Sequence, residues 1–276
     1  MAIDLIATDL DGTFLDSKGR VSELNRRAVL LAAQQGVTTV IATGRPPRWL
    51  DGVLDTLRPA RPTVIASNGA LVVDLDTRRI EQIRPVPADA ALEYASRLQR
   101  VVPDAHFAVE YSDGWGREPA FTPRQDRGTV DAVDTLADLL VTGQPVKLLA
   151  SSASLSTQQL AEAGEPLAAG LLTCTYSYVS PQGLLELSAP GISKGSALAG
   201  VLAELGLSAA GVAAFGDMPN DLDMLQMAGQ PYVMANAHPA LLAAGFPVAG
   251  DHNDSGVGAV VLRLLAESAN GLSLAG

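Results

Sequence analysis

Short apolar runs, each ending in a polar residue or a glycine, are the feature that most limits how this chain can fold. These runs are Ile3–Thr8, Val37–Ala42, Thr63–Ala66 and Val212–Phe215, and they end at Asp9, Thr43, Ser67 and Gly216. Helical patterns stand between them: Ser22, for example, is placed to cap a helix that runs to Gln35 and stops at Gly36. Strands that alternate with helices predict an α/β fold with a mostly parallel sheet.

The alternation is interrupted after Gly69 and resumes at Ser193. The interruption begins with a predicted hairpin of residues 70–74 and 79–84. We then expect helices near residues 88–101, 129–140 and 157–168, and strands near 106–111, 146–150, 173–179 and 184–187. The pattern therefore predicts a Rossmann-like parallel-sheet core, residues 1–83 and 189–276, with an inserted α+β cap domain over residues 84–188. A strand near Val248 and a helix over residues 258–266 should complete the core.

Charge and composition exclude several classes of protein. The formal net charge is −11 and the isoelectric point is about 4.6, which argues against a nucleic-acid binder. No apolar run is long enough to span a membrane, and the N-terminus lacks the pattern of a signal peptide. Cys174 is the single cysteine, so no internal disulfide can form, and we interpret it as a packed strand residue. We expect a cytoplasmic protein with neither a nucleic-acid nor a membrane partner, and leave its oligomeric state open.

Polar residues at the strand ends are the candidates for function, because ligands of open α/β sheets bind beyond the carboxyl ends of the strands. They are Asp9, Asp11, Thr43, Asn68, Asp217, Asn220 and Asp221. Three of these carboxylates, brought together without a cation, would repel one another. A divalent metal removes this repulsion, and a ligand set made only of oxygen atoms suits Mg²⁺ better than Zn²⁺. The scattered histidines, His106, His238 and His252, are interpreted as structural or surface residues.

Asp9 is a plausible nucleophile, since carboxylates can form aspartyl-phosphate intermediates. Such a reaction needs its phosphate oxygens neutralised, which Lys194, Thr43 and backbone amides could do. It also needs a proton for the leaving group. Asp11 could supply this proton and afterwards activate the water that hydrolyses the intermediate.

Four segments, in this order, resemble the motifs of the haloacid dehalogenase superfamily. They are Asp9-Leu10-Asp11-Gly12-Thr13, Thr43-Gly44-Arg45, Gly191-Ile192-Ser193-Lys194-Gly195 and Gly216-Asp217-Met218-Pro219-Asn220-Asp221. Too few residues separate Asp9 from Thr43 to hold a cap, and the large insertion lies between Thr43 and Lys194. This arrangement resembles the Cof-like, IIB-type members, as do the segments Ser67–Ala70 and Val233–Ala237.

The resemblance implies a role for each matching residue. Mg²⁺ would be bound by Asp9, the backbone carbonyl of Asp11 and Asp217, with Asp221 supporting the metal shell. Phosphate would be contacted by Leu10 through its backbone, Thr43, Gly44, Lys194 and Asn220. Asn68 is a candidate substrate contact. The implied activity is hydrolysis of phosphomonoesters, namely sugar phosphates or related small metabolites, through an aspartyl-phosphate.

Other interpretations were weighed against this one. An EF-hand counted from Asp9 fails, because Thr13 and Phe14 stand where an acid and a glycine are needed. A phosphosugar mutase and a non-catalytic phosphate-binding module stay as alternatives. We also expect the cap to move as a lid, with Trp115 and Arg117 reading the substrate. An ordinary exposed loop is the competing interpretation of that segment.

Overall fold

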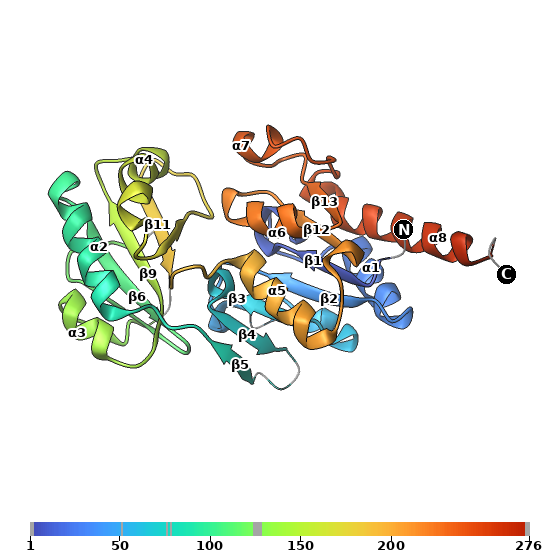
Figure 1. The fold of residues 1–276 in the computed structure, drawn as a ribbon, viewed down its shortest axis with the longest axis horizontal. Helices are drawn as coiled ribbons and strands as arrows, with labels where there is room; N and C mark the ends of the chain where they lie inside the picture. Colours follow the sequence, from blue (N-terminus) through green and yellow to red (C-terminus); the bar gives the residue numbers. More distant parts are fainter. Residues whose placement is uncertain (1–2, 51, 76, 78, 124–128, 274–276) are drawn as a thin grey trace.

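Two β-sheets organise the molecule (Figure 1). The computed structural model describes residues 3–50, 52–75, 77, 79–123 and 129–273. The first sheet has the strand order β13-β12-β1-β2-β3-β4-β5, and the second has the order β10-β11-β9-β6-β7-β8. The strands of the first sheet come from the N- and C-terminal parts of the chain, and those of the second sheet come from its middle. This arrangement confirms an α/β fold with a second sheet inserted in the sequence.

The first sheet is parallel except at one edge. Its strands are β1 (Leu5–Thr8), β2 (Thr38–Ala42), β3 (Thr63–Ala66), β4 (Leu71–Asp74), β5 (Ile80–Ile83), β12 (Val212–Gly216) and β13 (Gln230–Val233). The predicted hairpin after Gly69 is present as β4 and β5, which pair antiparallel. Central β1 pairs in parallel with both β12 and β2, so the ends of these three strands lie at one edge of the sheet.

Both faces of this sheet are buried beneath helices. The helices are α1 (Glu23–Gln34), α5 (Lys194–Leu205), α6 (Leu222–Met227), α7 (Pro239–Leu242) and α8 (Gly256–Ser273). Neighbouring residues of β1 point in opposite directions: Ile6 packs in the cluster that holds residues of α1 and α8, and Leu5 packs with residues of α5 and α6. A strand that is apolar on both sides is the pattern expected of a parallel sheet between two helical layers.

Helix α1 begins as the sequence predicts. The Ser22 side chain accepts a hydrogen bond from the Asn25 amide at 3.1 Å, which satisfies one of the amides left open at a helix N-terminus. Gly36, with φ of +78°, lies just beyond the last turn. Its left-handed conformation ends the helix before β2 at little steric cost.

In the described part of the chain, the helices of the second sheet lie on one of its faces. Its strands are β6 (His106–Tyr111), β7 (Trp115–Arg117), β8 (Ala132–Val133), β9 (Pro145–Ser152), β10 (Thr173–Thr175) and β11 (Gly183–Ser188). Its helices are α2 (Ala88–Val101), α3 (Leu136–Val141) and α4 (Thr157–Ala168). Figure 1 shows these helices on the side of the sheet that faces away from the first sheet. The other face of the second sheet is therefore turned toward the strand ends of the first.

Residues 84–87 and 189–193 join the two sheets. We call residues 84–188 the cap segment, and the division of the chain at these positions stays a prediction. Some local expectations within it were wrong. The helix predicted near residues 129–140 is instead β8 followed by α3, because Asp131 accepts a hydrogen bond from the Trp115 amide at 2.7 Å and Thr135 caps a later helix start. The strand predicted near 173–179 ends at Thr175, and Val248 forms only an isolated bridge to Val233.

Within the described part of the chain, none of the helices combines the length and the apolar character needed to cross a bilayer. Cys174 lies in β10, where burial raises the pKa of its thiol to about 12. The thiol stays protonated near neutral pH, so the interpretation as a packed strand residue holds.

Asn25 ties the loop after β1 to helix α8, and this contact makes a prediction about stability. Its fully buried amide donates to the Phe14 carbonyl at 2.7 Å and accepts from the Gly258 amide at 2.8 Å. Asn25→Ala leaves both backbone groups buried without a partner, and should lower the free energy of unfolding by about 2–4 kcal/mol. Gln34→Ala, on the exposed end of the same helix, should change it by less than about 0.5 kcal/mol. Urea denaturation measures both, and equal effects would contradict this account.

Candidate active site

The ends of β1 and β12 place two carboxylates side by side. Asp9 follows directly after β1, and its amide donates to the carbonyl of Phe215 in β12 at 2.9 Å. Asp217 follows directly after β12. The parallel register of these two strands therefore carries Asp9 and Asp217 to the same edge of the sheet, as predicted.

Asp9, Asp217 and Asp221 form a buried acidic cluster. One carboxylate oxygen from each lies within 4.8 Å of the others, and the three residues are at most 7% exposed. The Lys194 ammonium, from the first residue of α5, lies 2.5 Å from Asp9 Oδ1 and 2.6 Å from Asp221 Oδ1. One ammonium thus stands against three carboxylates.

The excess negative charge of this cluster contributes to raised pKa values of Asp9 and Asp217. Burial raises the pKa of Asp9 well above its usual range, with Asp221 and Asp217 adding to the shift and Lys194 opposing it. Burial and the neighbouring Asp221 likewise raise the pKa of Asp217 to about 7. Lys194 compensates only part of the negative charge of these carboxylates, and their donor set is made only of oxygen atoms. Both properties fit a hard divalent cation such as Mg²⁺.

Backbone and hydroxyl donors orient this acidic cluster. Asp221 Oδ2 accepts from the amides of Asp217 and Met218, both at 3.0 Å, while Thr13 Oγ1 donates to Asp217 Oδ1 at 2.8 Å. Gly12 makes room for this contact: with φ of +79°, an added Cβ would lie 2.4 Å from Asp217 Oδ2. The glycine of the first motif is therefore needed for the approach of the fourth motif.

Asp11 points away from the acidic cluster. Its carboxylate is bound by the Arg45 guanidinium, with Nε 2.7 Å from Oδ2 and Nη2 2.5 Å from Oδ1. The Asp11 side chain is 54% exposed, in contrast to the three clustered acids. Arg45 was noted in the sequence only as part of its motif, so this pairing was missed.

A tight turn after β3 brings Asn68 to the same edge of the sheet. Ser67, Asn68 and Gly69 all have positive φ, of 50°, 56° and 101°. The backbone amide of Asn68 donates to the Thr43 carbonyl at 3.0 Å. The side-chain oxygen of Asn68 accepts from Asn220 Nδ2 at 3.2 Å. The second motif, this turn and the fourth motif are thus in direct contact.

A cavity of about 1050 Å³ opens over these residues, between the two sheets. Of the predicted site residues, the ones that line it are Asp9, Asp11, Gly44, Asp217 and Asn220. The side chains of Thr43, Asn68, Lys194 and Asp221 and the residue Leu10 are buried behind or beside this wall. The cap segment supplies the opposite wall, which is formed by Glu110, Lys147, Leu149, Ser177, Tyr178, Val179, Ser180, Gln182, Leu184 and Glu186.

The prediction that Trp115 and Arg117 read the substrate is wrong, because neither lines this cavity. Trp115 is 3% exposed and packs in an apolar cluster of the cap segment with Phe121 and Leu184. Arg117 Nη1 donates to the carbonyls of Glu118, Pro119 and Phe121. Glu110, Lys147 and Glu186 were missed as site residues. Their signal in the sequence is a charged residue inside an otherwise apolar strand.

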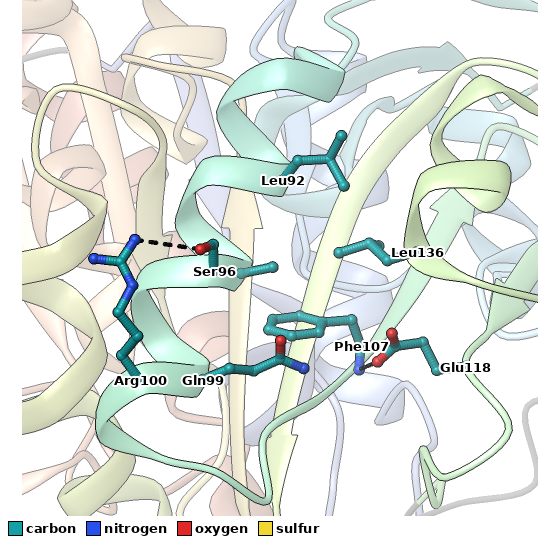
Figure 2. A pocket seen from close by; sticks show the side chains of 8 residues that line it. Leu92, Ser96, Gln99, Arg100, Phe107, Glu118 and Leu136 are labelled. Carbon is teal, nitrogen blue, oxygen red and sulfur yellow. Dashed lines mark hydrogen bonds between the residues drawn. The ribbon is translucent and has the colours of Figure 1, made fainter.

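A smaller cavity of about 350 Å³ lies elsewhere in the cap segment, between α2 and β6 (Figure 2). Its polar side chains are engaged locally: Glu118 accepts from the Phe107 amide at 2.7 Å, and Arg100 donates to Ser96 at 3.3 Å. None of the motif residues lines it. The chemistry predicted from the motifs therefore belongs to the larger cavity.

The histidines stay outside the acidic cluster. The His238 ring accepts a hydrogen bond from the Ala240 amide at 3.2 Å at the start of α7. A ring nitrogen of His252 lies 2.8 Å from the Leu15 carbonyl, so the loop that carries His252 supports the segment following Asp9. These two contacts agree with a structural interpretation.

The raised pKa of Asp217 predicts how the metal-free protein responds to pH. Between the ordinary value of 3.8 and about 7, folded Asp217 holds a proton that the unfolded chain releases. The free energy of unfolding should therefore fall as pH rises through this window, by on the order of 2–4 kcal/mol. Thermal unfolding in chelator at a series of pH values measures this fall.

Asp217→Asn is the variant that tests the cause. It removes the repulsion and keeps an oxygen for Thr13, so in chelator near pH 8 its Tm should exceed that of the parent. Added Mg²⁺ should raise the Tm of the parent but not of the variant. A variant that is less stable than the parent at this pH would contradict the repulsion.

Comparison with known proteins shows which family this chain belongs to. A family model described as haloacid dehalogenase-like hydrolase matches residues 6–261. Phosphatase YwpJ of Bacillus subtilis (strain 168) is 28% identical, over 95% of this chain and 99% of that protein. Pyridoxal phosphate phosphatase YbhA of Escherichia coli (strain K12) is also 28% identical, over 93% and 97%.

A solved structure described as a HAD subclass IIB sugar phosphatase superimposes with a TM-score of 0.78 at 17% identity, covering 94% of this chain and 98% of that one. This likeness confirms the Rossmann-like core with a cap that the interrupted alternation of strands and helices predicts. The chain belongs to the haloacid dehalogenase-like hydrolases.

Proposed function

We propose that this protein is a Mg²⁺-dependent phosphomonoester hydrolase that acts on small phosphorylated metabolites through a phosphorylated Asp9. The buried cluster of Asp9, Asp217 and Asp221 around Lys194, beside a cavity that the cap segment also lines, carries this proposal. The names of the relatives support the hydrolase class, since both are phosphatases and one acts on pyridoxal phosphate. A single cysteine, half-buried and unpaired, is compatible with the cytoplasmic location expected from the sequence.

Asp9, Asp217, Asp221 and the Asp11 carbonyl would hold Mg²⁺, which when bound supplies positive charge to the phosphate oxygens. Lys194 supplies a second, fixed positive charge at the same place, because it touches Asp9 directly. Thr43, Gly44, the Leu10 backbone and Asn220 surround the position where the phosphate would lie. These groups bind and orient the phosphoryl group against the Asp9 carboxylate.

Two displacements complete the reaction. An oxygen of Asp9 bonds to phosphorus while the bond from phosphorus to the ester oxygen breaks. Asp11 leaves Arg45 and takes up a proton before this step, and then gives that proton to the departing oxygen. Asp11, now ionised, then takes a proton from water as the water oxygen bonds to phosphorus. The bond from phosphorus to Asp9 breaks, so inorganic phosphate leaves and Asp9 is regenerated. The cap segment covers the cavity and excludes bulk water during the first step.

Hydrolysis of 4-nitrophenyl phosphate tests this function. Activity should vanish in chelator and return with Mg²⁺. Asp9→Asn should reduce kcat by at least about 10³-fold, since an amide is a poor nucleophile. An acid quench during turnover should trap a covalent phosphoenzyme in the parent protein and none in this variant. Full activity without a divalent ion, or in the Asp9 variant, would rule the proposal out.

Asp11 as the proton donor makes a separate prediction. Asp11→Asn should slow release of phosphate from an alkyl ester such as glucose 6-phosphate by about 10²–10⁴-fold, because an alkoxide is a poor leaving group. Hydrolysis of 4-nitrophenyl phosphate should fall much less, as nitrophenolate leaves without a proton. Comparing kcat for the two substrates measures the difference. Identical losses would show that Asp11 is not the acid.

A further inference from the structure

Three charged residues stand on the face of the second sheet that lines the large cavity. Glu110 comes from β6, Lys147 from β9 and Glu186 from β11, and each is at most 8% exposed. We call these three residues the cap charge cluster. Buried charges are rare unless they are paired or serve a function, so their presence here needs an explanation.

Strand alternation explains why all three face the cavity. Glu110 and Lys147 are cross-strand partners, and Glu186 pairs with Leu149, two positions beyond Lys147 on the same face. The residues between them point the other way, into the apolar core under α2 and α4: Val109, Leu148 and Leu185 are examples. Each strand is thus apolar toward its helices and charged toward the first sheet.

The Lys147 ammonium, the positive charge of the cap charge cluster, is paired with carboxylates of the same cluster. Lys147 Nζ lies 3.2 Å from Glu186 Oε2 and 3.8 Å from Glu110 Oε2, and it donates to the Gly44 carbonyl at 2.6 Å. Arg48 Nη2 lies 3.5 Å from Glu110 Oε1, but Arg48 does not line the cavity. Of the charged side chains with which the cap segment lines the cavity, two are carboxylates and one is an ammonium, while Arg48 contacts Glu110 from outside the lining.

Glu186 is held in its charged form. Burial alone would raise its pKa, but Lys147 and the hydrogen bonds from Ser177 and Asn68 lower it below the ordinary value. These donors lie at 2.8 Å for Ser177 and 2.5 Å for Asn68. Arg45, the other cation along the described lining of the cavity, is engaged by Asp11.

The two ends of the cavity thus differ in the charge they accept. At the acidic cluster, Lys194 and a bound Mg²⁺ would compensate a phosphate. At the cap wall, a second anionic group would meet carboxylates and find Lys147 occupied. Hydroxyl and amide side chains also line this wall, namely Ser177, Ser180 and Gln182. They suit a partner that carries hydroxyl or amino groups.

We propose that the phosphate is the only anionic group of the substrate, so that its organic part is neutral or cationic and carries hydroxyl or amino donors, with Glu110 as a specificity-determining residue. This inference rests on the phosphatase activity proposed above. It excludes bisphosphates and phosphorylated carboxylic acids as preferred substrates. Repulsion of a second anionic group by Glu110 and Glu186 would cause this preference.

Three aryl phosphates of similar size test this charge preference: phenyl phosphate, 4-carboxyphenyl phosphate and 4-(aminomethyl)phenyl phosphate. The readout is kcat/KM from release of inorganic phosphate, with Mg²⁺ present. The carboxylated ester should be poorer than phenyl phosphate by at least about tenfold, because like charges placed together are disfavoured. The aminomethyl ester should equal or exceed phenyl phosphate. A carboxylated ester that is as good as phenyl phosphate would overturn the inference.

Two variants with opposite expected effects separate charge from packing. The quantity compared is the kcat/KM of phenyl phosphate divided by that of 4-carboxyphenyl phosphate. Glu110→Gln should lower this ratio about tenfold, toward one, and Lys147→Gln should raise it. A structural defect would lower activity on all three esters together. Shifts of the ratio in the same direction in both variants would also overturn the inference.

Glu162→Gln is the matched control, because Glu162 is an exposed residue of α4 that does not line the cavity. The control should leave the ratio unchanged. The two proposals fail differently. If none of the three esters nor 4-nitrophenyl phosphate releases phosphate, the proposed hydrolase activity is wrong. If all are hydrolysed without regard to charge, the activity stands and the substrate inference is wrong.

Discussion

The contact of Lys194 with Asp9 and Asp221 joins three segments that lie far apart in the sequence. The ammonium is 1% exposed and lies at 2.5 and 2.6 Å from the two carboxylates, so its burial depends on both of them. Removing one partner of a buried ion pair is costly, since it leaves a charge without compensation. The ends of β1 and β12 and the start of α5 must therefore form together. The phosphate-binding end of the cavity follows from this one arrangement.

The parallel sheet restricts chemistry to its edge. Both faces of β1 are covered by apolar side chains, and Asp9, directly after the strand, is the first residue of that segment to line the cavity. The turn of Ser67 and Asn68, with positive φ at both residues, is strained for side chains other than glycine and is held by the Thr43 carbonyl. Strain of this kind is retained where a side chain must be aimed, here Asn68 toward Asn220.

The core and its site were largely predictable because their signals are local. A strand, its polar end and the following glycine are adjacent in the sequence, so Asp9, Thr43 and Asp217 could be placed from the pattern alone. The cap was less predictable. Trp115 looked like a substrate contact, but tertiary packing buries it beside Phe121. The charges at Glu110 and Lys147 were visible in apolar strands, yet only the placement of the helices shows that they face the cavity. The pairing of Arg45 with Asp11 gave no sequence signal.

Asn68 makes the two ends of the cavity dependent on each other. Its side-chain oxygen accepts from Asn220 of the fourth motif, and its side-chain nitrogen donates to Glu186 of the cap segment. Lys147 repeats this connection, since the same ammonium contacts Glu186 and the carbonyl of Gly44. Because Gly44 and Asn220 are phosphate-contact candidates, the cap carboxylate touches the phosphate end through two separate residues. A group that alters the charge around Glu186 will therefore also disturb Asn68 and Gly44. Selection of the organic part and positioning of the phosphate are thus physically coupled through one buried carboxylate.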